Sequence, residues 1–138
     1  MSTEHFSFLI VVVFVIFFFI ATIYAYYLYK KHLNNYENFF KQYRQDGLYI
    51  DSISNLSSNF GFVLYYLKIA FFVRLLQDKK MYVEKGKLVD KACYEYMHNL
   101  PKEKTAWMWS WRQTHFIQAF LFFISLILGF LHSIFYHY

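Results

Sequence analysis

The stretch FSFLIVVVFVIFFFIATIYAYYLY (residues 6–29) contains no charged residue in 24 positions. About 20 apolar residues in an α-helix cross the roughly 30 Å hydrocarbon core of a bilayer. Val and Ile lower helix propensity in water, but in lipid the backbone must satisfy its own hydrogen bonds. A cleaved signal peptide would have a basic start and an apolar run of only about 7–15 residues. We therefore predict a retained transmembrane helix over residues 6–29, after a short outer tail (residues 1–5).

A second apolar stretch, FIQAFLFFISLILGFLHSIF, covers residues 116–135 and carries no formal charge apart from any on His132. Apolar residues make up 58% of the 138 residues and aromatic residues 25%, which is more than a soluble domain of this size can bury. We predict a second transmembrane helix over residues 116–135 and an outer tail over residues 136–138.

Aromatic and cationic side chains flank both stretches, as is typical of the ends of transmembrane helices. They predict the membrane-interface residues, which are Tyr26, Tyr27, Lys30 and Lys31 after the first stretch and Trp107, Trp109, Trp111 and Arg112 before the second.

The charges predict the orientation. All 14 Lys and Arg residues and eight of the nine acidic residues lie between Lys30 and Arg112, so this part carries 14 − 8 = +6. The positive-inside rule then places the middle (residues 30–115) in the cytoplasm and both termini outside. Attraction to anionic lipid headgroups accounts for the basic balance. The sequence has no zinc-finger, helix-turn-helix or RNA-binding signature, so we expect no nucleic-acid partner.

Within the middle, the first helix is expected to continue over residues 30–45 and to end at the turn formed by Asp46-Gly47. The polar stretch DSISNLSSN (residues 51–59) is typical of a loop. Residues 87–99 predict an amphipathic helix. The sequence Asn99-Leu-Pro101 predicts a new helix that runs on into the second span.

Residues 60–76, FGFVLYYLKIAFFVRLL, are the ambiguous part of the middle. They are almost long enough to span, but a central Lys such as Lys68 costs on the order of 2.5–3.5 kcal/mol on insertion scales. A helix in the membrane interface, or one packed against the spans with Lys68 extending outward, is favoured. A third membrane segment is the alternative. The predicted fold class is an all-α membrane protein with a transmembrane helix at each end and a helical cytoplasmic middle.

The sequence contains no motif for catalysis or phosphate binding, so we predict no catalytic, cofactor-binding or metal-binding residue. His115 and His132 are interpreted as interfacial polar residues, because roughly 25 Å of helix separates them and they cannot share a metal. Gln118 and His132 either extend toward the membrane surface or contact a partner. The single cysteine, Cys93, is interpreted as a small apolar residue of the core.

Small residues repeat at every fourth position in both spans and predict close helix packing. In antiparallel spans the two sets lie at different depths, so at least one is expected to be free for a helix of another chain. The predicted helix-packing residues are Ala21 and Ala25 in the first span and Ser125, Gly129 and Ser133 in the second.

Residues 39–72, FFKQYRQDGLYIDSISNLSSNFGFVLYYLKIAFF, resemble the universal stress protein B family of small bacterial inner-membrane proteins. In both, a turn at Asp46-Gly47 precedes an aromatic residue, Tyr49, and a polar loop leads to an apolar stretch with Tyr65-Tyr66. The family's longer glycine run after the turn and its Arg-rich approach to the last span are missing here. The resemblance implies a stress-associated protein of the bacterial inner membrane and no catalytic residues.

Together these features predict a non-enzymatic accessory or regulatory subunit of an inner-membrane complex, with other integral membrane proteins as partners. A self-associating, membrane-permeabilising protein of the holin type is the alternative. A haem-binding electron-transfer subunit is a third and less favoured hypothesis.

Overall fold

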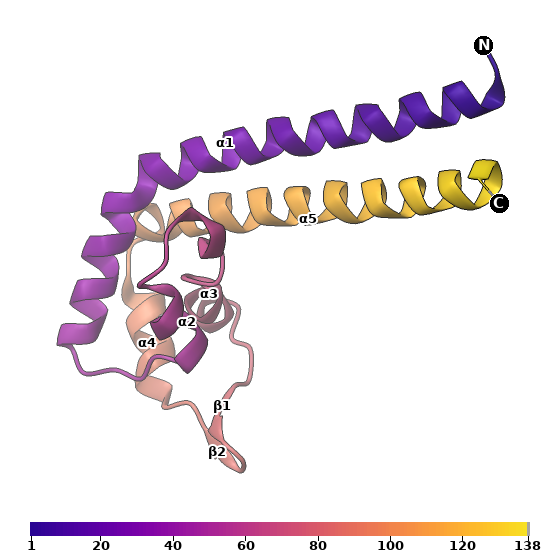
Figure 1. Ribbon diagram of the computed structural model, residues 1–138. Helices are drawn as coiled ribbons and strands as arrows, with labels where there is room; N and C mark the ends of the chain where they lie inside the picture. The colour runs from indigo at the N-terminus through magenta and orange to yellow at the C-terminus, as the bar shows by residue number, and fades with distance from the viewer. Residues whose placement is uncertain (138) are drawn as a thin grey trace. The chain divides into compact units, whose positions relative to one another are not determined.

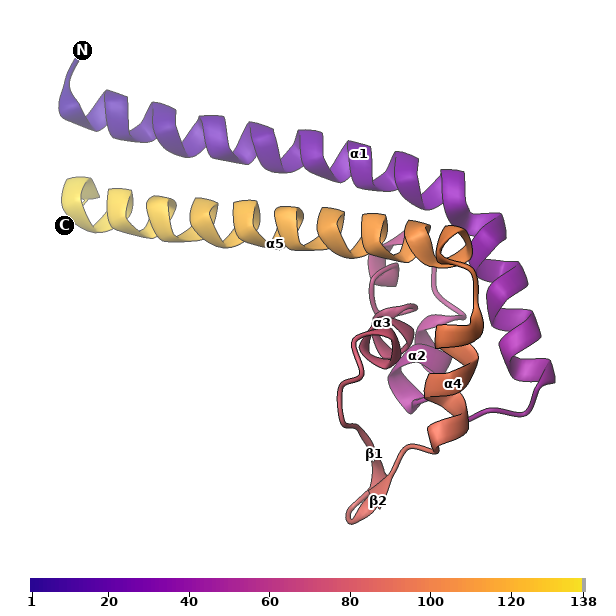
Figure 2. The same ribbon diagram turned by 180° about the vertical axis from the view of Figure 1, so that it is seen from behind.

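The computed structural model describes residues 1–137, so Tyr138, the last residue of the predicted outer tail, lies outside the described part. The chain divides into two units. One, here called the helix pair, comprises Met1–Tyr27 and Gln113–Tyr138, and the other, the middle domain, comprises Leu28–Arg112. The elements labelled in Figure 1 and seen from behind in Figure 2 are α1 (Thr3–Gln45), α2 (Ser52–Ser57), α3 (Ala70–Leu76), β1 (Tyr82–Glu84), β2 (Lys87–Leu88), α4 (Lys91–Asn99) and α5 (Lys102–His137). A 3₁₀ turn, η1 (Phe62–Leu64), lies between α2 and α3.

The helix pair consists of antiparallel parts of α1 and α5. Phe18 packs on Phe122 with ring centroids 5.7 Å apart, and Val11 lies opposite Gly129. Large apolar side chains on the outer faces stay exposed, as they do on a helix whose solvent is lipid. Within residues 1–137, α1 and α5 are the two helices that are long and apolar enough to cross a membrane.

The middle domain is built around aromatic rings from three helices. Phe72 of α3 packs edge-to-face on Phe39 and Tyr43 of α1, at centroid distances of 4.8 and 4.9 Å. Trp111 of α5 is fully buried, and its Nε1 donates a hydrogen bond of 3.2 Å to the Leu28 carbonyl of α1. Tilted and edge-to-face contacts of this kind stabilise aromatic pairs beyond their burial.

Trp107 and Trp111, two of the predicted membrane-interface residues, are buried inside the middle domain, so their rings pack on protein, and their depth in the membrane stays a prediction. They are four residues apart and therefore share one face of α5, which packs on Tyr36 of α1 at ring distances of 6.3 and 6.0 Å. Trp109, on another face, is 39% exposed, and the guanidinium of Arg112 lies 5.8 Å from its ring.

The predicted continuous helix over residues 60–76 is also absent. This stretch forms η1, a series of turns and then the short helix α3, so it is no candidate for a third span. Phe71, Phe72 and Leu75 of α3 are buried in the middle domain. Their apolar surface is covered by protein, which removes the need for lipid that the sequence pattern indicated.

The polar stretch over residues 51–59 forms α2 rather than a loop. Asp51 caps the helix, since its carboxylate accepts a hydrogen bond of 2.9 Å from the Ser54 amide. The prediction of an all-α fold fails at β1 and β2, which pair antiparallel. Gly86 between them has a φ of +82°, a conformation that glycine adopts at little cost.

The remaining helices follow the sequence more closely. α1 extends to Gln45 as predicted, and the turn after it contains Gly47 with a φ of +69°. α5 begins after Pro101 and runs without a break to His137. The amphipathic helix begins later than residue 87, because Asp90 caps α4 through a 3.0 Å hydrogen bond from the Ala92 amide.

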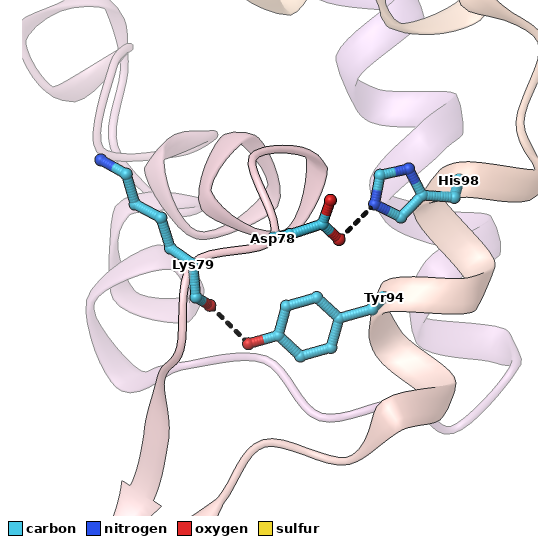
Figure 3. A network of polar contacts seen from close by, with 4 residues as sticks. All are labelled: Asp78, Lys79, Tyr94 and His98. Atoms are coloured by element: carbon cyan, nitrogen blue, oxygen red, sulfur yellow. Dashed lines mark hydrogen bonds and ion pairs between the residues drawn. The ribbon is translucent and has the colours of Figure 1, made fainter.

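Two polar contacts join α4 to the segment after α3 (Figure 3). His98 Nε2 lies 2.8 Å from Asp78 Oδ1, and the Tyr94 hydroxyl donates a 2.6 Å hydrogen bond to the Lys79 carbonyl. Asp78 has a φ of +55°, which Asp tolerates better than most residues. Both side chains of the ion pair are exposed, so its net stabilisation is at most about 1 kcal/mol.

If Trp111 is a core residue, Trp111→Ala should destabilise the protein by about 3–5 kcal/mol, because it leaves a cavity and removes the bond to Leu28. The matched control Trp109→Ala should cost less than about 1 kcal/mol. Chemical unfolding in mild detergent, followed by near-ultraviolet circular dichroism, measures both. Equal losses for the two variants would contradict the core assignment.

Candidate functional site

The polar residues of the second apolar stretch bond within the helix pair. Gln118 Nε2 donates a 3.1 Å hydrogen bond to Thr22 Oγ1, and His132 Nδ1 lies 3.1 Å from Ser7 Oγ. These two contacts join α1 and α5 at two levels. The sequence left open whether Gln118 and His132 extend outward or contact a partner; the structure gives both a partner in the same chain.

The small residues of the two spans also lie against other residues of the same chain. Ala25 is fully buried, and a Cβ atom added to Gly129 would lie 4.0 Å from Val11 Cγ1. Gly129 thus lies opposite Val11 rather than Ala21 or Ala25, which agrees with the expected difference in depth. Since each set has a neighbour within the chain, their mismatch no longer argues for a helix of another protein. Ser125 and Ser133 are half-buried.

Lys68 is the most unusual polar residue of the middle domain. It is 2% exposed, although the sequence predicted an outward side chain. Its Nζ donates a 3.4 Å hydrogen bond to the Ser58 carbonyl and lies 5.1 Å from the centroid of the Tyr36 ring. Burial lowers the pKa of Lys68, and the charge of Glu37 partly opposes this effect. An ammonium with so few acceptors is costly to bury, so this position is a candidate for function.

Tyr36, beneath the Lys68 ammonium, adds a second buried polar group. Its hydroxyl is buried without a hydrogen-bond partner in the described part of the chain, and burial raises its pKa. The hydroxyl is both donor and acceptor, so an unpaired one in the interior is uncommon. No pattern in the sequence indicates this pair, because residues 36 and 68 meet only in the folded domain.

A groove of about 440 Å³ opens beside Tyr36. Its charged lining consists of Glu37, Lys41 and Arg44, so the cations outnumber the acid. Arg44 is held in place by the Phe40 ring, 4.7 Å from its Cζ, and by a hydrogen bond to the Asn55 side chain.

A second groove, of about 320 Å³ and here called the amide groove, lies between α1 and the start of α5. α1 contributes Asn35, Asn38 and Gln42, which recur at helical spacing along one face. α5 contributes the oppositely charged Glu103 and Lys104. Phe39, Leu100 and Trp107 complete the lining. Such a surface offers hydrogen-bond donors and acceptors over an apolar base, and it can hold a polar protein segment.

The structure brings together no metal centre: within residues 1–137, no group of three or more His, Cys, Asp or Glu residues could hold a metal ion. Cys93 is fully buried in α4, with its Sγ 3.9 Å from the Tyr49 carbonyl, as expected of a packing residue.

Comparisons with known proteins identify no relative of this chain. No protein-family model, no curated protein and no solved structure matches the chain. The resemblance to the universal stress protein B family is therefore neither supported nor refuted and stays a prediction.

The contact between Gln118 and Thr22 should stabilise the helix pair modestly. Gln118→Leu is expected to cost about 0.6 kcal/mol, the average of interhelical hydrogen bonds in membranes. Thr22→Val is the partner variant, and a double-mutant cycle isolates the bond from changes in packing. Unfolding in mixed micelles measures it, and a coupling energy of zero would show that the bond contributes nothing.

Lys68→Met should stabilise the middle domain at neutral pH by about 1 kcal/mol, because it removes a charge with few acceptors from the interior. The pKa of Lys68 is lower in the folded than in the unfolded chain, so wild-type stability should rise with pH between these two values. Unfolding midpoints between about pH 7 and about pH 9 test this, below the titration of ordinary tyrosines. If Lys68→Met were less stable than the wild type and its stability rose with pH to the same extent, burial of the Lys68 charge would not be the cause.

Proposed function

We propose that this protein is a non-enzymatic accessory or regulatory subunit of a bacterial inner-membrane complex. The helix pair anchors it, and the middle domain is the part that meets the partner on the cytoplasmic side. The observation that carries the proposal is the amide groove, because the packed core of the middle domain holds its lining residues in place.

The support for this groove comes from the core beneath it. Phe39 and Trp107 form part of its lining and are themselves buried, with ring centroids 6.4 Å apart. The exposed amides of α1 therefore stand on a helix whose other face is fixed by aromatic packing. A surface that is already ordered loses little conformational entropy when a partner binds.

The cytoplasmic location of the middle domain follows from the positive-inside rule. Lys30 and Lys31 follow the first span, and Lys102, Lys104 and Arg112 precede the second. These basic residues also favour anionic headgroups on the same side of the membrane.

The small residues no longer favour the holin-type alternative, and they no longer favour the accessory subunit either. The holin-type alternative relied on small residues that are free for contact between copies, whereas Ala25 is buried within the chain and Gly129 faces Val11. A haem-binding function would need a second histidine from another chain, because roughly 25 Å of helix separates His115 from His132.

Purification of the full-length protein from its native membranes in mild detergent, with mass spectrometry of the accompanying chains, tests the proposal. We expect an integral membrane protein to copurify with the wild type but not with the double variant Asn38→Arg/Gln42→Arg, whose long cations fill the groove. Glu84→Arg in β1 is the matched control and should keep the partner. The absence of any reproducible membrane partner would overturn the proposal, and equal retention by both variants would exclude the amide groove.

A further inference from the structure

The short helix α2 has an inverted distribution of polarity. Its serines Ser54 and Ser57 are buried, whereas Ile53 and Leu56 point outward and are 57% and 62% exposed. The Ser54 hydroxyl explains part of this, since it donates a 3.3 Å hydrogen bond to the Leu67 carbonyl. A helix in water normally buries its apolar face. The outer face of α2 is therefore suited to an apolar environment.

The segment after α2 also exposes large apolar side chains. Val63 in η1 is 89% exposed, the highest value among the large apolar residues of the middle domain, and Phe60 and Leu67 are exposed as well. No charged residue lies between Asp51 and Lys68. We call the exposed apolar residues of this segment the apolar wedge: Ile53, Leu56, Phe60, Val63 and Leu67.

The position of η1 within the middle domain relates the wedge to the membrane. Phe62 of η1 packs on Tyr29 with ring centroids 5.7 Å apart, and Tyr65 stacks on Phe62 at 5.2 Å. Tyr29 is the last residue of the uncharged stretch 6–29, and Lys30 follows it. η1 is therefore packed against the residue at which the uncharged stretch ends.

We propose that the apolar wedge inserts into the boundary between the headgroups and the acyl chains of the cytoplasmic leaflet. This inference rests on the membrane anchoring assumed in the proposed function. The occupant is lipid because the segment lacks charges that would pair with a protein surface and because η1, which carries Val63, packs through Phe62 on Tyr29 at the end of the uncharged stretch. The exposed side chains of Asn55 and Asn59 between the apolar residues of the wedge can bond to headgroups, as in interfacial amphipathic segments.

The wedge also gives a reason for the sequence pattern over residues 60–76. Its apolar residues serve two surfaces: those of α3 fill the core, and those around η1 face lipid. Lys68 lies between the two groups, where its ammonium bonds to the Ser58 carbonyl. The interfacial location expected for residues 60–76 is thereby proposed for the turns around η1, whereas α3 belongs to the core.

Site-specific fluorescence in nanodiscs tests the insertion. The full-length protein carries Cys93→Ala, so that one introduced cysteine receives an environment-sensitive NBD label, and the lipids are phosphatidylcholine with phosphatidylglycerol. Val63→Cys reports on the wedge. Glu84→Cys, in β1, is the exposed control, and Phe17→Cys, on the lipid-facing side of α1, reports on the span. Nanodiscs leave both membrane faces open to the aqueous quencher iodide.

We expect the Val63 label to emit at a shorter wavelength than the Glu84 label and to be quenched several-fold less by iodide. Lipids with a nitroxide near the headgroup should quench it strongly, and the Phe17 label should respond to nitroxides deep in the acyl chains. A Val63 label as accessible to iodide as Glu84 overturns the wedge while the Phe17 result preserves the anchor. Protection from iodide without nitroxide quenching also overturns it, since protein then covers the site. An iodide-accessible Phe17 label would contradict the proposed anchoring itself.

Discussion

The Trp111 indole connects the two long helices of the middle domain, and the rest of that domain depends on the connection. Its Nε1 donates to the Leu28 carbonyl of α1, and its ring packs on Tyr29, Tyr36, Tyr65 and Trp107. A flat ring with one donor can satisfy a buried carbonyl and fill a large volume at once. Because Tyr65 belongs to the segment between η1 and α3, the same indole fixes the chain that returns from α2. The outer positions of Val63 and Leu67 follow from that arrangement.

The high aromatic content therefore has two uses. In the helix pair, rings such as Phe17 and Phe123 are exposed and suited to lipid, whereas in the middle domain Phe72 and Tyr43 form a core. A domain of this size buries little apolar surface for each residue, and large rings increase the amount that it can bury. Lys68 lies at the edge of this core, where burial lowers its pKa and the Tyr36 ring and the Ser58 carbonyl provide partial compensation.

The polar contacts of the helix pair and the grooves of the middle domain divide the functional tasks. Gln118 and Thr22 hold two helices together within one chain, which leaves the proposed subunit contacts to the domain. The amide groove faces a protein partner in our proposal, and the apolar wedge faces lipid. Two different surfaces on one small domain can fix its position relative to the membrane while it binds a neighbour.

The sequence by itself determined the two long apolar helices, the continuation of α1 to the turn at Gly47, and the start of α5 after Pro101, because these depend on local composition, capping and backbone preference. It did not determine which apolar residues face protein and which face lipid. Trp107 and Trp111 have the pattern of a membrane belt, and the apolar residues of α3 that of a span, yet all are covered by residues distant in the chain. Burial is a property of such distant contacts, and for that reason only the tertiary structure placed Lys68 inside and Val63 outside.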